Sequence, residues 1–269
     1  MRLNNQVWNA LTIFGKENNR DIFTTYTESF MLGCEHELES STIYFQKDDI
    51  KQVNSMLNNL EYIDSWEWTE IEEKNWNQKC KDFFKPVVID KEVEILPYWE
   101  DAKSSYLSIK INPALAFGTG HHETTYMMIQ AMLTFDLNEK SVFDIGTGSG
   151  ILSILAKKRG AKNIVAIDND ELTYNNFYEN LELNNINNGI EFKIKDCFDV
   201  DNFNYDFIFA NINLNVLLDL IPKINTKGTI LILSGILSSD ENLLFKVLNK
   251  QKIKNIYKRE EWLCLVIQL

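Results

Sequence analysis

A glycine-rich stretch at residues 144–150, Asp-Ile-Gly-Thr-Gly-Ser-Gly, points more directly to chemistry than any other part of this sequence. It follows an apolar run, Ser141–Ile145, that predicts a strand, and it precedes a predicted helix at Ile151–Arg159. Glycines at such a junction permit a tight turn and let a ligand lie against backbone N–H groups at the start of the helix. The spacing fits neither the dinucleotide pattern G-x-G-x-x-G nor the phosphate-binding pattern that ends in Gly-Lys-Ser/Thr.

An acidic residue, Asp168, ends the next predicted strand, Asn163–Ile167, and lies 22 residues after Gly146. At this position in a doubly wound sheet, an acidic side chain meets the hydroxyls of a bound ribose. Taken alone, Asp168 could equally cap the following helix beside Asp170. Together with the glycine loop it predicts a nucleoside ligand. The pattern D-x-G-x-G-x-G followed by this acid resembles the S-adenosylmethionine-dependent methyltransferases with a seven-stranded core.

Two further stretches narrow the resemblance. Residues 112–125 include the run Phe-Gly-Thr-Gly at 117–120 and the run His-His-Glu-Thr-Thr at 121–125, and the fourth predicted strand ends in Phe-Ala-Asn-Ile at 209–212. With the glycine loop, these stretches resemble the ribosomal protein L11 methyltransferase (PrmA) family. The likeness covers roughly residues 70 to 269 and includes Pro-Tyr-Trp at 97–99, Leu-Ser-Gly-Ile-Leu at 233–237 and Glu-Glu-Trp at 260–262.

The resemblance implies a small substrate-recognition domain, a linker and a domain that binds S-adenosylmethionine. It also implies methylation of a basic ribosomal protein at its N-terminal α-amine and at lysine ε-amines. The cofactor contacts that it implies are Thr125, Gly146, Asp168 and Asn211. The sequence departs from the family at 121–125, where the usual motif is Thr-His-Pro-Thr-Thr, and at Thr147, where Cys is frequent. Both final threonines and all the glycines are present, so cofactor binding is still expected.

Six more residues are predicted to belong to the cofactor site: Asp144, Gly148, Gly150, Phe117, Gly118 and Asp196. We interpret residues 117–120 as a lid over the methionine end of the cofactor, with a simple turn before a helix at Glu123–Leu133 as the alternative. Asp196 follows the third strand, where this fold approaches the adenine, or else it is a turn residue before Cys197.

His121 and His122 are adjacent, with no third ligand type nearby. We therefore expect loop contacts or the edge of the cofactor pocket from them, and no metal site.

Methyl transfer to an amine is an in-line displacement, and near-attack positioning can supply about 7–11 kcal/mol of its barrier. The amine must arrive neutral, although a free lysine has a pKa of about 10.4. We expect Asn211 to be the catalytic residue that accepts a hydrogen bond from the amine and aims its lone pair. A cationic sulfonium beside the site would itself lower the pKa of the amine. No dedicated base is therefore predicted.

The elements that must position these residues alternate between strand and helix from about residue 140 onward. This alternation predicts an α/β fold with a doubly wound, seven-stranded Rossmann-like core, which ends in an antiparallel hairpin at 252–258 and 262–269. Before residue 75, the pattern predicts strands at 7–14, 42–45 and 62–68 and a helix at 49–60. We expect a small α+β domain at 1–74, a linker with a helix at 75–100 and a methyltransferase domain at 101–269.

Composition limits the partners. The chain has 269 residues and a net charge of −12, which argues against nucleic acid or an anionic membrane as the main ligand. Residues 1–110 hold 20 acidic and 12 basic residues and so carry −8 of this charge. The sharpest acidic patch, 61–73, contains Trp66 and Trp68 at strand spacing. It is either a solvated face or a docking edge for a basic protein.

The start of the sequence has no apolar signal-peptide core, and no window reaches the length of a membrane span. With four scattered cysteines, these features predict a cytoplasmic protein with free thiols, and we expect a monomer. The 30 Asn and 4 Arg are interpreted as compositional bias without functional meaning. Two other functions stay open: a methyltransferase for another protein or a small-molecule amine, and a non-catalytic subunit that binds the cofactor.

Overall fold

The computed structural model describes residues 7–16, 19–20, 23–24, 27, 31, 33–36, 39–45, 47–57, 63–72, 84–102, 105–113, 118, 120–224, 226–248 and 253–269. The chain divides into two compact units, Met1–Phe83 and Phe84–Leu269, which are described separately. Within the described ranges, every helix is too short or too polar to span a lipid bilayer.

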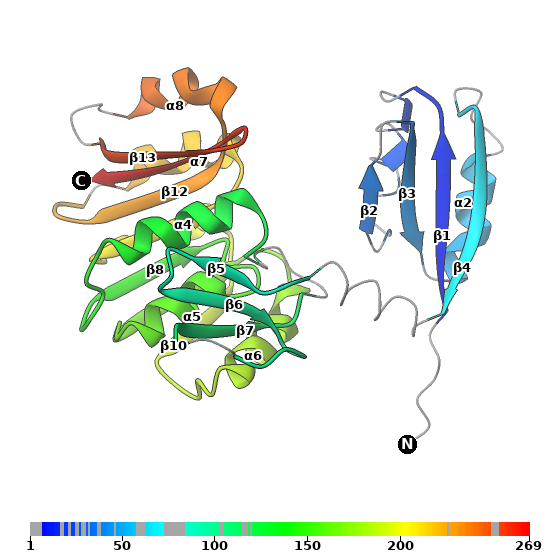
Figure 1. Cartoon of the computed structure of the whole chain (residues 1–269). Helices are drawn as coiled ribbons and strands as arrows, with labels where there is room; N and C mark the ends of the chain where they lie inside the picture. Colours follow the sequence, from blue (N-terminus) through cyan, green and yellow to red (C-terminus); the bar gives the residue numbers. More distant parts are fainter. Residues whose placement is uncertain are drawn as a thin grey trace. The chain divides into compact units, whose positions relative to one another are not determined.

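The N-terminal unit is an antiparallel sheet with the strand order β2-β3-β1-β4 (Figure 1). Its strands are β1 (Val7–Phe14), β2 (Gly33–His36), β3 (Ser40–Phe45) and β4 (Ser65–Glu72), and α2 (Ile50–Leu57) follows the short 3-10 turn Lys47–Asp49. Alternate residues of β1, such as Leu11 and Ile13, form one core with Val53 and Leu57 of α2. This burial of one face explains the period-two pattern of β1.

Trp68 lies on the buried face of β4, as its spacing predicts. Its ring packs against this core, 5.8 Å from the ring of Phe45, and its indole N–H donates to Asn54 Oδ1 at 2.9 Å. Trp66 is 37% exposed at the edge strand. β1 matches its predicted bounds, whereas β2 was not predicted.

The second unit is built on a seven-stranded sheet with the order β10-β9-β8-β11-β12-β14-β13 (Figure 1). Its strands are β8 (Ser141–Ile145), β9 (Asn163–Asp168), β10 (Ile190–Ile194), β11 (Phe207–Asn211), β12 (Ile230–Leu237), β13 (Ile253–Arg259) and β14 (Trp262–Gln268). The five strands β8 to β12 pair with one another in parallel. β14 runs antiparallel to both β12 and β13. The predicted fold class and the terminal hairpin are confirmed.

Helices cover both faces of this sheet. They are α4 (Glu123–Leu133), α5 (Ile151–Lys158), α6 (Thr173–Leu183), α7 (Leu214–Leu220) and α8 (Glu241–Val247). α4, α5 and α6 share one core with Phe209 of β11, whereas α7 and α8 share the other core with Ile208 of the same strand. Successive side chains of a strand point to opposite faces, so β11 is apolar from Phe207 to Ala210 and only its last residue, Asn211, is polar.

A three-stranded sheet precedes α4, in the order β5 (Val87–Ile89), β6 (Val93–Pro97) and β7 (Leu107–Ile111). The sequence predicts a linker over residues 75–100 and none of these three strands. In the structure, β5 and β6 fall within that range and belong to the second unit. The linker helix falls on residues 75–85, of which 75–83 lie outside the described residues.

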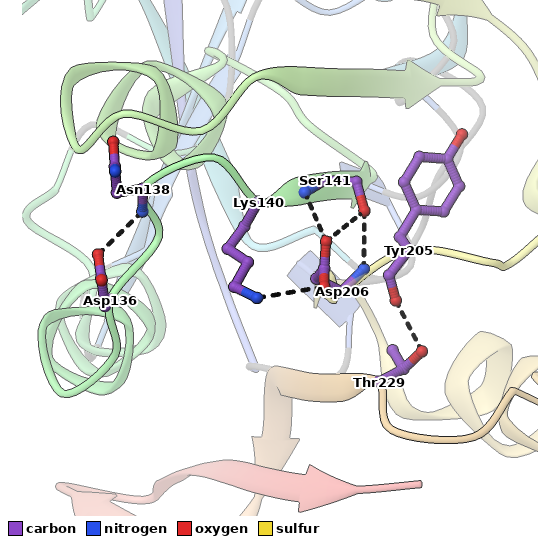
Figure 2. Close-up of polar contacts among 7 residues, drawn as sticks. All are labelled: Asp136, Asn138, Lys140, Ser141, Tyr205, Asp206 and Thr229. Carbon is purple, nitrogen blue, oxygen red and sulfur yellow. Dashed lines mark hydrogen bonds and ion pairs between the residues drawn. The ribbon is translucent and has the colours of Figure 1, made fainter.

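The amino ends of the central strands form the edge of the sheet opposite the glycine loop (Figure 2). There the Asp206 carboxylate accepts from the backbone N–H of Ser141 at 2.9 Å and from its hydroxyl at 2.7 Å, and it pairs with Lys140 at 3.5 Å. The two hydrogen bonds from Ser141 lower the pKa of Asp206. Thr229 donates to the Tyr205 carbonyl at 2.7 Å. These groups satisfy one another and join neighbouring strands, which is a structural role.

Candidate functional site

The glycine loop connects β8 to α5 at the carboxyl edge of the sheet. Gly146, Gly148 and Gly150 all have positive φ, at 68°, 52° and 81°. The backbone N–H groups of Gly146 and Thr147 both donate to the carbonyl of Ile167 at the end of β9, at 2.9 and 3.0 Å. The loop is therefore bent over the end of the neighbouring strand, where the sequence analysis expects a ligand.

Gly146 must be glycine for a second reason. A Cβ atom at this position would overlap Cγ2 of Ile212, which follows β11. The backbone of the loop therefore lies directly against the residue after Asn211. This approach brings three predicted site residues, Gly146, Asp168 and Asn211, to the ends of three neighbouring strands.

Asp168 ends β9 with its carboxylate held by the backbone. Oδ2 accepts from the N–H of Gly148 at 2.9 Å, and Oδ1 accepts from the N–H of Asp170 at 3.0 Å. Asp168 does not cap α6, because the residue before that helix is Leu172. Each carboxylate oxygen keeps further acceptor capacity, so the fixed carboxylate can bind the hydroxyls of a ribose.

Asp144 is fully buried beneath the glycine loop. Its Oδ2 accepts from the hydroxyls of Thr147 at 2.6 Å and of Ser153 at 2.7 Å, while Oδ1 has no hydrogen-bond partner among the described residues. Burial raises the pKa of Asp144 to about 6, against the effect of the two hydroxyls. Asp144 therefore ties the loop to α5 from below and does not line the cleft.

A cleft opens beside Asp168 at the carboxyl edge of the sheet. Its lining residues come from the ends of β8, β9, β10 and β11 and are Ile145, Gly146, Ile167, Asp168, Asn169, Lys195, Asp196, Cys197, Phe198, Ile212, Asn213 and Val216. Asp196 lies in this wall and also caps the 3-10 turn Cys197–Asp199, because its Oδ1 accepts from the N–H of Phe198 at 2.8 Å. Asp196 is therefore a turn residue that also lines the cleft, and its position near the adenine stays a prediction.

Asn211 and Thr125 meet on the other side of Ile212. The Asn211 amide nitrogen lies 3.4 Å from Thr125 Oγ1, while its Oδ1 is buried without a hydrogen-bond partner among the described residues. Thr125 is fully buried in the first turn of α4. An unpartnered buried amide oxygen indicates a missing hydrogen-bond donor.

A second hollow lies at Asn211 and was not predicted. It is lined by His122, Thr124, Asn211, Ile212, Asn213, Gly235 and Trp262. It shares Ile212 and Asn213 with the first cleft. The two hollows therefore adjoin at the end of β11.

His122 and Trp262 form one wall of the second hollow, with their ring centroids 5.1 Å apart. His122 also caps α4, because its Nδ1 accepts from the N–H of Thr124 at 3.3 Å. Burial lowers the pKa of His122, although Glu123 and Glu261 act in the opposite sense. His122 thus lines the second hollow and not the cleft beside Asp168, and its predicted place at the edge of the cofactor pocket stays a prediction. The described residues contain no group of three or more His, Cys, Asp or Glu that could hold a metal.

Of the remaining predicted residues, Gly118 is buried and its carbonyl accepts from Ser149 Oγ at 2.7 Å. Phe117 and Thr119 lie outside the described residues. The interpretation of residues 117–120 as a lid therefore stays a prediction.

The strand order and the glycine loop after β8 define a class I methyltransferase fold. The family model described as "Ribosomal protein L11 methyltransferase (PrmA)" matches residues 3–269. The chain belongs to this family.

Curated relatives and a solved structure agree with this assignment. A ribosomal protein L11 methyltransferase from Clostridium perfringens (strain SM101) is 35% identical over 204 residues, covering 73% of this chain and 65% of that protein. The match thus spans just under two thirds of that relative's length. A relative of the same name from Prochlorococcus marinus (strain MIT 9312) is 34% identical over 253 residues, covering 86% and 79%.

The crystal structure of a ribosomal protein L11 methylase from Lactobacillus delbrueckii subsp. bulgaricus matches with a TM-score of 0.63. It is 31% identical, and the match covers 69% of this chain and 98% of that one.

Asp144 predicts a pH-dependent stability. Because folding raises its pKa from 3.8 to about 6, the folded state binds more protons than the unfolded state in this window, and stability falls as the pH rises through it. The loss is at most about 3 kcal/mol. The measurement is the free energy of unfolding in urea for the wild type and for Asp144→Asn. We expect the difference, wild type minus variant, to fall as the pH rises from about 4 to about 6 and to stay constant above about pH 6.

Asp206→Asn is the matched control, because the pKa of Asp206 is lowered. Its contribution is lost only as the pH falls below about 4, so the corresponding difference should stay level from about pH 5 upward. A difference for Asp144→Asn that is constant across this range would contradict the buried titration.

Proposed function

We propose that this chain is an S-adenosylmethionine-dependent N-methyltransferase whose acceptor is ribosomal protein L11. The observation that carries the proposal is the pair of adjoining hollows at the end of β11. One is walled by the fixed carboxylate of Asp168. The other is mostly apolar and is lined in part by Asn211, whose buried amide oxygen has no hydrogen-bond partner among the described residues. A nucleoside donor and an amine acceptor would meet where the two hollows share Ile212.

The residues of the first hollow fit the cofactor. The carboxylate of Asp168 can accept from the ribose hydroxyls, and Asp196, which lines the same cleft, is the residue proposed to lie near the adenine. Gly146 lines the same hollow, and its lack of a Cβ lets the loop backbone lie directly against Ile212. When bound, S-adenosylmethionine supplies a methyl group on a positively charged sulfonium. The proposed cofactor contacts are Gly146 and Asp168, which line this hollow, and Thr125 and Asn211, which lie outside its lining.

Asn211 is the proposed catalytic residue. Its free Oδ1 can accept a hydrogen bond from the acceptor amine and so orient the nitrogen lone pair. Nδ2 lies near Thr125 Oγ1, which limits rotation of the amide. No base of lowered pKa is needed, because a cationic donor close by favours the neutral amine.

The walls of the second hollow suit a lysine side chain. The Trp262 ring and Ile212 offer apolar contact to the aliphatic chain. The lowered pKa of His122 keeps its imidazole neutral at pH 7, so it does not repel an incoming ammonium group. We propose lysine ε-amines and the N-terminal α-amine as acceptors. Because the proposed substrate is a ribosomal protein, we infer that this chain is a cytoplasmic monomer that does not bind nucleic acid directly.

The N-terminal unit is the proposed docking module for the basic substrate. In its described sheet β4 is an edge strand, and it carries exposed Glu67 and Glu70 next to the partly exposed Trp66. Glu67 and Glu70 point to opposite faces of the strand, since they are three residues apart. A negative edge of this kind would steer a basic protein and raise its association rate.

Incubation with labelled S-adenosylmethionine and purified L11 tests the function. The wild type should label L11. Asp168→Ala should lower labelling about 10- to 100-fold at subsaturating cofactor, because a charged hydrogen-bond acceptor is lost. Label on a different protein or on a small amine would support the alternative methyltransferase, and binding of the cofactor without any transfer would support a non-catalytic subunit.

Asn211→Ala tests the positioning of the amine. At saturating cofactor and L11, its kcat should fall about 10- to 100-fold, because the acceptor loses its orientation. Asn213→Ala is the control, since Asn213 borders both hollows but its Oδ1 caps α7 by accepting from Val216 N–H at 3.1 Å. Its kcat should stay within about threefold of the wild type. A near-wild-type kcat for Asn211→Ala would reject the role.

Replacing both Glu67 and Glu70 with Gln tests the docking edge. We expect the KM for L11 to rise about threefold or more at low salt and to approach the wild-type value at high salt, with unchanged cofactor affinity. The control, Glu182→Gln with Glu191→Gln, makes the same charge change at exposed positions of the second unit. An unchanged KM in the first variant would mean that the acidic strand is only a solvated face.

A further inference from the structure

β7 is an edge strand of its described sheet, and asparagine side chains from α6 and its C-cap cover its outer edge. Asn184 accepts from the N–H of Lys110 at 3.0 Å and donates to the carbonyl of the same residue at 2.7 Å. One helical turn earlier, Asn180 Oδ1 accepts from the N–H of Asn112 at 2.7 Å, and Asn176 donates to the Asn112 carbonyl at 3.1 Å. Three amides at a spacing of four residues thus replace a partner strand.

Asn180 has a second contact that sets it apart from Asn184. Its Nδ2 donates to the carbonyl of Ser149 in the glycine loop at 2.8 Å. The same nitrogen lies 3.2 Å from Asn176 Oδ1. Asn180 is fully buried, so one side chain joins the glycine loop, α6 and the end of β7 without access to water.

The carbonyl of Ser149 lies in the loop next to the residue that holds the Asp168 carboxylate. The preceding residue, Gly148, donates its N–H to Asp168, and the following residue, Gly150, begins α5 with positive φ. The Ser149 hydroxyl is also engaged, by the carbonyl of Gly118. A shift of Ser149 would therefore move the donor that fixes the Asp168 carboxylate.

We propose that Asn180 is a positioning residue for the cofactor site. It holds the Ser149 peptide and, through Gly148, sets the carboxylate of Asp168. This role rests on the proposed function only in identifying the ligand as S-adenosylmethionine. It needs an amide, because one atom must donate to Ser149 while the other accepts from Asn112. An aspartate has the same shape but places a negative oxygen against the Ser149 carbonyl.

The test compares Asn180→Asp with Asn184→Asp. Both are isosteric changes at buried positions, Asn180 within α6 and Asn184 at its C-cap. Each removes an amide donor, to the Ser149 carbonyl in the first case and to the Lys110 and Asn180 carbonyls in the second. Only Asn180 contacts the glycine loop. The two variants should lose similar thermal stability, because each buries an unfavourable carboxylate. Titration calorimetry with S-adenosylhomocysteine, at a temperature where both variants are folded, then measures the site directly.

We expect Asn180→Asp to raise the Kd for S-adenosylhomocysteine about tenfold or more, which corresponds to about 1.4 kcal/mol. Asn184→Asp should stay within about threefold of the wild type, because its contacts do not reach the loop. In the methylation assay, Asn180→Asp should raise the KM for S-adenosylmethionine, while kcat and the KM for L11 stay close to wild type. Asn180→Ala, which removes the amide without adding charge, should show a smaller rise in Kd and covers the case in which Asn180→Asp does not fold.

Equal Kd values for the wild type, Asn180→Asp, Asn180→Ala and Asn184→Asp would overturn the positioning role and leave the proposed function standing. An equal rise in the Asn180 and Asn184 variants would also overturn it, since the effect would then be general destabilisation. A wild type that does not bind S-adenosylhomocysteine would overturn the proposed function itself and this inference with it.

Discussion

The candidate site depends on the packing of one residue, Ile212, which follows β11, between two glycines from the strands on either side of β11. Gly146 leaves β8 and Gly235 lies in β12, and a Cβ atom on either would overlap Ile212, on its side chain in the first case and on its backbone in the second. β12 is bulged here, with a register shift between Leu233 and Ile236. This close approach lets the chain after β11 pass between the two hollows. It also places Asn211 at their junction.

Among the described contacts, both backbone groups and buried side chains hold the glycine loop in place. Backbone N–H groups fix the loop on β9 and the Asp168 carboxylate on the loop. The buried side chains of Asp144 and Asn180 hold the loop from two directions, through Thr147 and through Ser149. The atoms left for ligands are few, and the amide oxygen of Asn211 is the clearest of them. A rigid loop with a small number of free acceptors favours one pose of a bound nucleoside.

The parts of the fold that the sequence predicted are those with strong local signals. The apolar run of β8 and its glycine loop predict the strand, turn and helix directly, and β8 and α4 have the predicted bounds. β6 was missed because its five residues are all buried and so lack the alternation of a half-buried strand.

Sequence reasoning also discounted the excess of asparagine as compositional bias, although Asn176, Asn180 and Asn184 pair with an edge strand more than sixty residues away. The pocket wall of His122 and Trp262 could not be predicted either, since it joins residues 140 positions apart. Both features depend on tertiary contacts that no local pattern carries.

The few arginines of the chain have specific roles that only the structure shows. The chain has 23 Lys and 4 Arg, and the described arginines make contacts that suit a planar group with several donors. Arg259 pairs with Glu123 at the start of α4, and its guanidinium lies 3.8 Å from the centre of the Tyr126 ring. It belongs to the hairpin that carries Trp262, while Glu123 follows His122. Arg259 therefore holds together the two elements that form the wall of the second hollow, which a lysine could not do with both contacts at once.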